Sequence, residues 1–368
     1  MKILQLIYES YGSPFGFGGA GVRAYEIYKR LKNRHDITLL CTRYPGARDG
    51  EIEGLRHIFL GTESSSITRS VLSYTLKASG FVKRHGKEFD IIVENFLPST
   101  PFFAGFLTDT PVVLQVQGIM ERHSLKKFGP LYSLPMYIVE KFYPFLYDKL
   151  IFVSEVTREK LLSKRGEKVR LCSTIPNGVS EDLLKITPED RGYLLFFSRI
   201  DTYTKGLDLL IRAFERISAK FPDIRLILAG YEFNRFKDLV AGCSPALRQR
   251  IEYAGFVTGD DKIRLLSGAR LFVLPSRHES SPISILEAAA CGKAVITSDI
   301  SELGFVSREE IGLTFSSGDA EALAERITGL LANDNLRASL GANGRRYAGL
   351  HIWDRIALEF EEFLIKAV

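Results

Sequence analysis

This sequence of 368 residues contains no apolar run that approaches the ~18–20 residues needed to span a bilayer. Its N-terminal apolar stretch is only a few residues long and is soon followed by Glu9. Such a stretch predicts a first β-strand, so a signal peptide is not expected. The sequence therefore does not indicate an integral membrane protein.

Cysteine clusters and metal-binding motifs are also missing. The four cysteines, Cys41, Cys172, Cys243 and Cys291, are widely spaced and include no CxxC pair. This spacing predicts neither a structural zinc site nor a disulfide framework, and a reducing cytoplasm fits it best. No HExxH motif, Asp-x-Asp motif or cluster of histidines with carboxylates occurs. We therefore expect no bound metal and no cofactor.

Charge is unevenly distributed along the chain, which has a formal net charge of +5. Residues 1–185 hold 26 Lys and Arg against 19 Asp and Glu, whereas residues 186–368 hold 23 against 25. A basic first half indicates an anionic partner for that half. The alternative is an ordinary solvated surface, because the excess is modest and diffuse.

Short apolar runs alternate with amphipathic stretches throughout the sequence. Most of the runs are rich in β-branched residues and apolar on both faces, as buried parallel strands are. The expected strands are 2–8, 37–41, 91–94, 112–116, 150–153, 193–197, 225–229, 251–254, 271–274 and 294–297. Helix-like segments such as 21–33, 206–219 and 320–332 lie between them. This alternation predicts an α/β protein with parallel sheets.

The alternation restarts after a loop-like stretch at 175–190, which predicts two domains. We place the first at 1–185 and the second at 186–345, each a doubly wound Rossmann-like unit. Two such domains would face each other across a cleft at the carboxyl ends of their strands, where ligands bind.

A glycine-rich loop, Gly16–Gly21, comes directly after the first expected strand and directly before a helix. Glycines such as Gly18 and Gly19 let backbone amides approach a ligand closely, and a helix N-terminus favours negative charge. The dinucleotide fingerprint would also need an acidic residue about 20 residues further on. None closes a second strand there, so a nicotinamide cofactor and a dehydrogenase are disfavoured.

Two cations follow the strand expected at 193–197. Arg199 closes that strand, and Lys205 lies just before an amphipathic helix. At the mouth of a parallel sheet, such a pair can clamp a diphosphate and stabilise it as it leaves. The alternative for either residue alone is an ordinary surface cation.

Two carboxylates flank the loop and helix after the strand at 271–274. Glu279 lies in the loop, and Glu287 lies in a helix of otherwise apolar or small residues. A buried carboxylate needs a partner, such as a pair of hydroxyls or, alternatively, a structural salt bridge. The alternative for Glu279 is a solvated loop acid.

The start of the same helix predicts an anion site. Ser281 is expected as the N-cap with a proline next to it, and Gly292 as the glycine after the helix. The amide groups near Ile283 and Ser284 would then favour a phosphate.

Taken together, these motifs resemble the retaining glycosyltransferases of family four, also called glycosyl transferases group 1, which have the GT-B fold. The resemblance covers nearly the whole chain. It includes Gly16–Gly21, 153–155, 176–179, the Arg199 and Lys205 pair, 228–230, Glu279 with Glu287, and 292–296. The tail with Trp353 resembles the family's final helices, which implies that a helix at about 346–368 packs back on the first domain.

The resemblance implies a role for each matching residue. Arg199 and Lys205 would bind the donor diphosphate, Glu287 the ribose hydroxyls, and Glu279 the transferred sugar near its reacting carbon. Transfer would proceed with retention, usually without a metal. The sequence departs from the family in two places: Gln117 stands where a histidine is common, and Tyr231-Glu232-Phe233 follow 228–230 where the family often has a second glycine. A glutamine can hydrogen-bond a sugar hydroxyl but cannot serve as a cation or a base.

The sequence therefore predicts a hexosyltransferase that uses a nucleotide-diphosphate sugar and a glycan or lipid-linked acceptor, with no nucleic acid as partner. The alternatives are a sugar-nucleotide epimerase of GT-B architecture and a non-catalytic sugar-nucleotide-binding module. A binding module should lack one of Glu279, Arg199 and Lys205, and all three are present. Neither the base nor the sugar of the donor follows from the sequence.

A basic and aromatic segment at 122–147, which includes Lys126 and Lys127, indicates a possible anionic membrane surface as a further partner. Peripheral attachment at the cytoplasmic face would follow. The preferred alternative is that much of 136–146 is a core helix.

Overall fold

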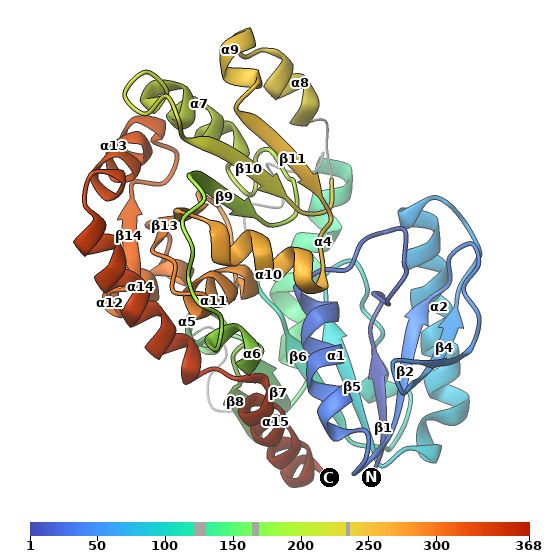
Figure 1. Ribbon diagram of the computed structural model, residues 1–368. Helices are drawn as coiled ribbons and strands as arrows, with labels where there is room; N and C mark the ends of the chain where they lie inside the picture. Colours follow the sequence, from blue (N-terminus) through green and yellow to red (C-terminus); the bar gives the residue numbers. More distant parts are fainter. Residues whose placement is uncertain (121–129, 164–168, 233–235) are drawn as a thin grey trace. The chain divides into compact units, whose positions relative to one another are not determined.

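The computed structural model describes residues 1–120, 130–163, 169–232 and 236–368, and of residues 130–132 only the backbone (Figure 1). The chain forms two compact units, Met1–Asn177 with Trp353–Val368, and Gly178–Ile352. The sequence-based boundary lay at 185/186. Residues 178–185 belong to the second unit because Val179 and Leu183 are part of its core. The short helix α6 (Glu181–Leu184) packs on helices of that unit.

The first unit is built on an eight-stranded sheet in the order β3-β4-β2-β1-β5-β6-β7-β8. Only β3 runs antiparallel to its neighbour. The strands are β1 Lys2–Leu6, β2 Asp36–Thr42, β3 Gly50–Ile52, β4 Leu55–Leu60, β5 Ile91–Phe96, β6 Val112–Val116, β7 Lys149–Phe152 and β8 Leu171–Thr174. The strand order reverses between β1 and β5, which are paired in the middle of the sheet.

Helices cover both faces of this sheet. Alternate residues of β1 point to opposite faces and contact different helices. Leu4 and Leu6 share a core cluster with residues of α2 (Ile67–His85). On the other face, Tyr28 of α1 (Gly19–Leu31) donates to Gln5 at 2.8 Å. The other helices that the structure describes in this unit are α4 Pro130–Phe142, α5 Glu155–Leu162 and α15 Trp353–Ala367, with short 3₁₀ turns at Gly86–Glu88, Ala104–Phe106 and Tyr143–Leu146.

The last helix, α15, packs along α1 (Figure 1). The ring of Phe360 meets that of Tyr28 edge to face at 5.8 Å, and both side chains are buried. Residues 346–352, which the sequence assigned to this crossing segment, instead complete α14 or connect it to α15. They therefore belong to the second unit.

The second unit has a six-stranded, fully parallel sheet in the order β11-β10-β9-β12-β13-β14. Its strands are β9 Tyr193–Phe197, β10 Arg225–Ala229, β11 Ile251–Gly255, β12 Leu271–Leu274, β13 Val295–Ser298 and β14 Gly312–Phe315. The helices are α7 Leu207–Ile217, α8 Phe236–Ala241, α9 Pro245–Arg248, α10 Gly259–Gly268, α11 Ile283–Ala290, α12 Phe305–Arg308, α13 Ala320–Leu331 and α14 Asp334–Gly349, with a 3₁₀ turn at Ser301–Leu303.

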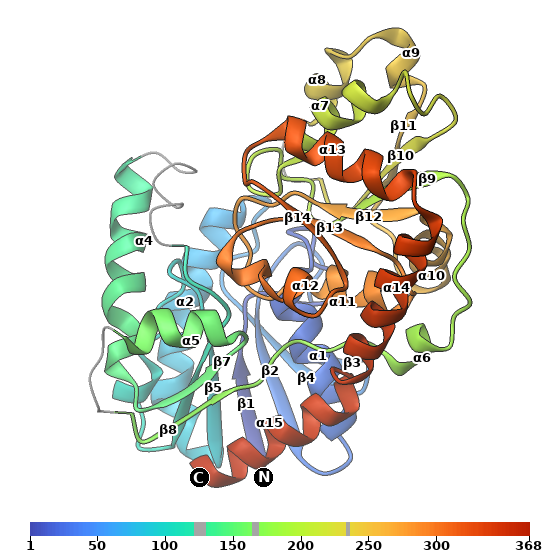
Figure 2. The same ribbon diagram turned by 90° about the vertical axis from the view of Figure 1, so that its left-hand side faces the viewer.

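This is the Rossmann strand order, and it reverses between β9 and β12. Helices α7 and α13 pack together on one face of the sheet, and α11 packs with α14 on the other (Figure 2). Ligands of such sheets bind beyond the carboxyl ends of the strands at the reversal point.

The strands that the sequence failed to predict are β3, β4, β8 and β14. They are short or only partly buried: β4 alternates between buried and more exposed residues, and all of β8 is partly exposed. A search for continuous apolar runs finds the buried central strands and misses short strands and strands with an exposed face.

Helix α4 and the turn after it expose an apolar stripe of Leu134, Ile138, Phe142 and Leu146. The interpretation of 136–146 as a simple core helix is therefore wrong for this stripe, which repeats every four residues as one helix face does.

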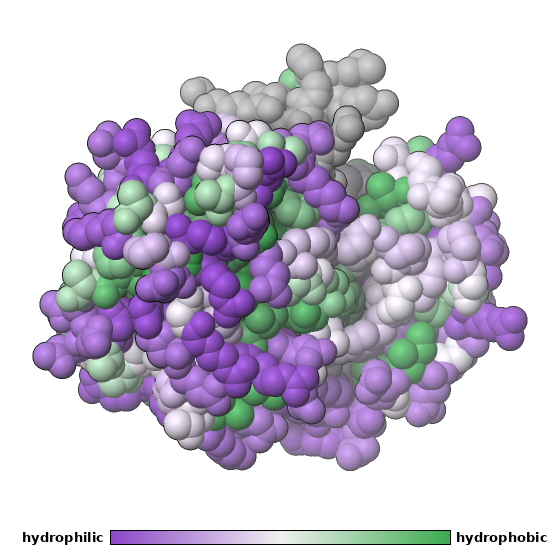
Figure 3. All heavy atoms as spheres, turned by 45° about the horizontal axis from the view of Figure 1, so that its top comes forward, coloured by the Kyte–Doolittle hydropathy of each residue, from purple (hydrophilic) through white to green (hydrophobic). Residues whose placement is uncertain are grey.

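No helix in the described part of the chain is both long enough and apolar enough to cross a bilayer. On the face shown in Figure 3, apolar residues lie among mostly hydrophilic ones.

Candidate functional site

An ion pair lies at the carboxyl edge of the second sheet, where the strand order reverses. Lys205 follows β9, and its Nζ lies 2.7 Å from Oε1 of Glu279, which follows β12. Ser276 donates its hydroxyl to the same oxygen at 2.6 Å. The two charged side chains are 15% and 6% exposed. The structure thus brings two of the sequence-predicted catalytic residues into direct contact.

The start of α7 lies close against the backbone of the loop after β12. Gly206, at φ +70°, is the N-cap of α7, and a Cβ there would lie 1.9 Å from the carbonyl oxygen of Pro275. Arg277 reinforces the contact with two hydrogen bonds to Asp208, at 2.7 and 2.8 Å. These contacts fix the relative position of the two loops that carry Lys205 and Glu279.

Arg199, the third predicted catalytic residue, lies on the same loop as Lys205. Its guanidinium is 3.6 Å from the carboxylate of Asp201, and its side chain is 45% exposed. Asp201 also accepts a hydrogen bond from the amide of Thr204 at 3.0 Å. Asp201 therefore links Arg199 to the turn that leads into α7.

Helix α11 begins one residue later than the sequence predicts. Pro282 is the N-cap, and Ser281 precedes it, so the prediction of Ser281 as N-cap is wrong. Ile283 and Ser284 form the first turn, where amide groups have no partner within the helix. These half-buried residues still offer the donors that favour an anion.

The end of α11 agrees with the prediction for Gly292, which has φ +70°. Its amide donates to Ala289 at 2.9 Å, and the amide of Lys293 donates to Ala288 at 3.0 Å. This is a Schellman motif. Burial lowers the pKa of Lys293 to about 8.

Glu287, in the middle of α11, has a basic partner. Lys262 of α10 places its Nζ 2.8 Å from Oε1 of Glu287, whose side chain is 10% exposed. The expected need for a partner is thus met by a salt bridge in the structure. The acidic pair Asp260 and Asp261 lies in the first turn of α10.

In the first unit, the glycine-rich loop binds a carboxylate of its own chain. Glu9 Oε2 accepts hydrogen bonds from the amides of Gly18 at 2.9 Å and Gly21 at 2.7 Å. Gly18 is the N-cap of α1, and Gly19 is its first residue. The structure therefore places an acidic group where the sequence predicts that a helix N-terminus favours anions.

Gln117 follows β6 and takes part in a buried amide network. Its Nε2 donates to Oδ1 of Asn95 at 2.8 Å, and Gln115 donates to the same oxygen at 3.2 Å. Arg23 of α1 donates to Oε1 of Gln115 at 3.4 Å and to the carbonyl oxygen of Pro176 at 2.6 Å. Burial lowers the pKa of Arg23 to about 9.

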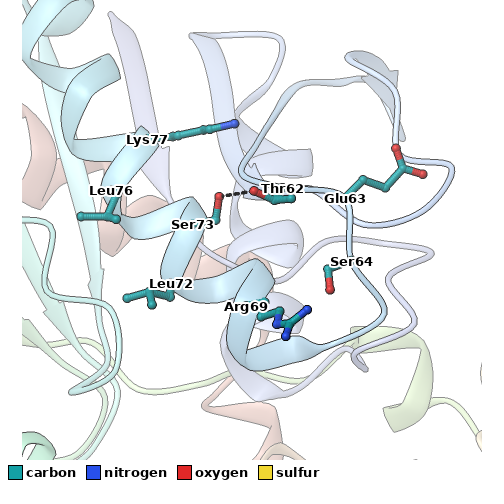
Figure 4. A pocket seen from close by; sticks show the side chains of 8 residues that line it. All are labelled: Thr62, Glu63, Ser64, Arg69, Leu72, Ser73, Leu76 and Lys77. Atoms are coloured by element: carbon teal, nitrogen blue, oxygen red, sulfur yellow. Dashed lines mark hydrogen bonds between the residues drawn. The ribbon is translucent and has the colours of Figure 1, made fainter.

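The loop after β4 forms one side of an open hollow of about 500 Å³ against α2 (Figure 4). The loop lies at the carboxyl edge of the first sheet, because it follows β4, which runs parallel to β2. The lining of the hollow includes Arg69, Leu72, Leu76 and Lys77, so cationic and apolar groups line one wall. The basic segment 122–128, with Lys126 and Lys127, lies outside the described residues.

The described residues include no group of three or more His, Cys, Asp or Glu side chains that could hold a metal ion. All four cysteines are free thiols. Burial raises the pKa of Cys41 and of Cys291, which makes both thiols poor nucleophiles.

Sequence reasoning missed several residues that hold the predicted ones in place. Glu9, Asn95, Lys262 and Ser276 all contact a predicted site residue. Two of them carried a signal: Asn95 stands near the end of a buried strand, and Ser276 lies two residues after the end of one. A polar residue in such a position often faces the ligand edge of a parallel sheet.

Comparison with known proteins agrees with this architecture. Residues 17–183 match the family described as Glycosyltransferase Family 4, and residues 184–347 match Glycosyl transferases group 1. A phosphatidyl-myo-inositol mannosyltransferase of Mycobacterium leprae (strain TN) is 31% identical over 215 residues, which are 56% of this chain and 56% of the relative. The chain therefore matches little more than half the length of that relative.

Among solved structures, sucrose-phosphate synthase from Thermosynechococcus elongatus superposes with a TM-score of 0.80 at 20% identity, covering 99% of this chain and 98% of that one. Anabaena HepE in complex with UDP and glucose gives a TM-score of 0.74 at 20% identity, covering 99% of each chain. These neighbours have the GT-B fold, as this chain does. Two consecutive family matches, on two Rossmann-like units, show that this chain belongs to the family 4 glycosyltransferases of the group 1 type.

Proposed function

We propose that this protein transfers a hexose from a nucleotide-diphosphate sugar to a glycan or lipid-linked acceptor, with retention of configuration and without a metal. The observation that carries the proposal is the contact between Lys205 and Glu279 at the reversal point of the second sheet. A cation beside a carboxylate in this position can stabilise a leaving diphosphate and contact the sugar attached to it.

The second unit supplies the donor site in this proposal. Arg199 and Lys205 neutralise the diphosphate, with amide groups at Ile283 and Ser284 and the hydroxyl of Ser281 as further donors. Glu287 accepts hydrogen bonds from the ribose hydroxyls. Both proposed carboxylates already have a lysine partner, so the donor exchanges with existing ion pairs when it binds.

The first unit supplies the acceptor site. Gly18, Gly19 and Gln117 lie at the carboxyl edge of its sheet, after β1 and β6. The hollow beside α2 adds Arg69 and Lys77 to this edge, which suits an anionic or lipid-linked acceptor. The similarity to a phosphatidyl-myo-inositol mannosyltransferase supports the same class of acceptor.

Attachment to an anionic membrane surface belongs to this proposal. The apolar stripe of α4 and the excess of basic residues in the first half support it. Sedimentation with anionic liposomes tests it. Binding should fall as salt rises and should weaken when Lys126 and Lys127 are replaced by Glu, because screening and charge reversal both remove the attraction. Protein that stays in the supernatant at low salt would refute membrane attachment.

The proposed activity is tested with a panel of UDP-, GDP- and ADP-sugars, by measuring nucleoside diphosphate release with and without candidate acceptors. We expect release from one class of donor and faster release with a suitable acceptor. Conversion of a sugar nucleotide to its epimer without release would indicate an isomerase. Nucleotide binding without turnover in any assay would indicate a binding module.

A further inference from the structure

Three buried side chains of the first unit, Glu94, Tyr143 and Tyr147, form a closed triangle of oxygen contacts that we call the Glu94 cluster. The Tyr143 hydroxyl contacts Oε1 of Glu94, and the Tyr147 hydroxyl lies 2.7 Å from Oε2 of the same carboxyl group. The two tyrosine hydroxyls lie 2.8 Å from each other. Glu94 is fully buried, and no cation pairs with it in the part of the chain that the structure describes.

The number of hydrogens in the triangle determines the protonation state of Glu94. Two oxygens at hydrogen-bond distance need one hydrogen between them, because otherwise their lone pairs face each other. The triangle has three such contacts, and the two tyrosine hydroxyls supply one hydrogen each. The third hydrogen can come only from the carboxyl group. The geometry therefore indicates a neutral carboxylic acid at Glu94.

The amide of Ala104 shows which carboxyl oxygen carries this hydrogen. Ala104 donates to Oε2 of Glu94 at 3.3 Å, and Tyr147 donates to the same oxygen, so Oε2 is the accepting oxygen. Oε1 is then the donor to Tyr143. The Tyr143 oxygen also accepts the amide of Phe103 at 2.6 Å, so its own hydrogen is directed to Tyr147. With this arrangement each of the three hydroxyl hydrogens has an acceptor.

The Glu94 cluster joins three parts of the first unit. Glu94 lies on β5, Tyr143 begins the 3₁₀ turn that follows α4, and Phe103 and Ala104 belong to the connection between β5 and β6. Phe103 has φ +55°, a left-handed conformation that residues with a side chain rarely adopt. Its ring meets that of Tyr143 edge to face at 4.9 Å. Tyr143 therefore holds a strained residue in place through both its hydroxyl and its ring.

Of the titratable groups in and around the cluster, Glu94 is the one that changes charge near neutrality. Burial raises the pKa of Glu94 to about 7. Burial also raises the pKa of Tyr143 and of Tyr147 far above the usual range of tyrosine. Tyr74 of α2 is close enough to interact electrostatically with Glu94, and burial raises its pKa well above the usual range too. The tyrosines therefore keep their protons when Glu94 loses its own.

The surroundings of Glu94 do not suit a charge. Its direct neighbours in the sheet are Leu6 on β1 and Leu114 on β6. On α4, the buried carboxylate of Glu140 accepts the amide of Met120 at 2.8 Å. An ionised Glu94 is a buried charge without a cation, which is costly unless water can reach it. Water reaches Glu94 when the residues that cover it move away.

We propose that the proton on Glu94 is a conformational switch: it locks Tyr143 and the segment at Phe103 and Ala104 onto β5, and its loss to solvent releases both. Without this proton the triangle has two hydrogens for three contacts, so the two tyrosine hydroxyls separate. Their separation moves the 3₁₀ turn and lets Phe103 leave its strained conformation. The released segment belongs to the connection that starts at the carboxyl edge of the first sheet, after β5. The switch does not depend on the proposed transferase activity.

Hydrogen exchange in the unaltered full chain tests the switch. The protection of the Phe103 and Ala104 amides is measured by NMR at pH 5 and pH 8 and corrected for intrinsic exchange rates. Opening should be about 10–100-fold more favourable at pH 8, because the open form binds the proton only with the ordinary affinity of a glutamate. At pH 8 both amides should exchange well before those of β1, as expected for local opening. Exchange together with β1, or protection that ignores pH, would overturn the proposal.

Glu94→Gln should remove this pH dependence and keep Phe103 and Ala104 protected at pH 8. Its side-chain amide offers the tyrosines both a donor and an acceptor and does not ionise. Glu140→Gln is the matched control, because Glu140 is another buried carboxylate of the same unit that lies outside the cluster. It should leave the pH dependence as it is. Loss of the pH dependence in Glu140→Gln, or its survival in Glu94→Gln, would assign the opening to another group and reject the switch.

Infrared spectroscopy observes the proton itself, because a neutral carboxyl group absorbs at a higher C=O frequency than a carboxylate. The difference spectrum between the unaltered protein and Glu94→Gln should contain this neutral-acid band at pH 5 and lose most of it at pH 8. Absence of the band at pH 5 would show that Glu94 is ionised in the folded protein and would refute the switch. If Glu94→Gln does not fold, the same band is followed in the unaltered protein, where it must disappear over the pH range in which the Phe103 amide loses protection.

Discussion

Lys205 Nζ lies 2.7 Å from Glu279 Oε1, which joins the loop after β9 to the loop after β12. These two strands are neighbours at the point where the strand order of the second sheet reverses. The pair therefore holds the proposed diphosphate-binding cation and the proposed sugar-contacting carboxylate together. A donor diphosphate must compete with Glu279 for Lys205.

Replacing Glu279 with Gln should separate turnover from binding. We expect kcat to fall about 10²–10³-fold, because a group next to the developing charge is lost. The affinity for UDP or GDP, measured by titration calorimetry, should stay equal or increase, since Lys205 no longer has a carboxylate partner. A loss of nucleotide affinity with unchanged kcat would contradict the assigned role.

Replacing Lys205 with Ala should lower kcat by about 10²–10³-fold, because the leaving diphosphate loses a cation. Lys205→Arg should retain more activity. Arg216→Ala is the control for the loss of one positive charge. Arg216 lies in α7 and forms a long, exposed ion pair with Glu321 at 3.7 Å. Added EDTA should leave the rate of the unaltered enzyme unchanged. Activity that disappears in EDTA and returns with Mg²⁺ or Mn²⁺ would show that a metal does this work.

Glu287→Ala should mainly weaken donor binding, seen as a higher KM with little change in kcat, because ribose contacts are similar in the ground and transition states. Lys262→Met provides the comparison. It removes the competing partner of Glu287 and should not weaken nucleotide binding. If both variants lost nucleotide affinity equally, the salt bridge would be needed only to keep α10 and α11 in place.

The stability of the first unit should fall as pH rises through neutrality because of Glu94. This buried carboxyl on β5 contacts Tyr143 and lies 2.7 Å from the hydroxyl of Tyr147. Burial raises the pKa of Glu94 from 4.5 to about 7. The folded state therefore binds this proton more tightly, and its stabilising effect is full below about pH 4.5 and lost as pH rises through about 7.

The loss should be on the order of 3 kcal/mol in unfolding free energy. Urea unfolding at pH 5 and pH 8 measures it. Glu94→Gln should remove most of this pH dependence, since an amide does not ionise. An unchanged pH dependence in Glu94→Gln would assign the effect to other groups.

Gly206→Ala should be far more destabilising than Gly192→Ala. Both glycines have φ +70°, so both substitutions carry the same left-handed strain of about 1–2 kcal/mol. A Cβ at Gly192 meets no atom within 4 Å, whereas one at Gly206 would lie 1.9 Å from Pro275 O. The difference in melting temperature therefore measures the close approach alone. Equal melting temperatures would show that the loop can move away without cost.

The sequence by itself determined the class of fold and the residue types at the proposed donor site. Strands such as β9, β10 and β12 are apolar on both faces because both faces are covered, and a continuous apolar run is visible without a structure. The glycine at 292 was likewise predicted, because a helix cap depends on neighbours in sequence.

Only the tertiary structure decided which polar residues meet. Lys205 and Glu279 are 74 positions apart, and Lys262 and Glu287 are 25 apart, so no local pattern connects them. The partner of Gln117 was equally hidden, because Asn95 reaches it only through the pairing of β5 with β6. Hydrogen bonds and ion pairs act over about 3 Å and need specific angles. Residue type therefore determines which interactions a side chain can make. The order of the strands and the close packing of the backbone determine which side chains meet.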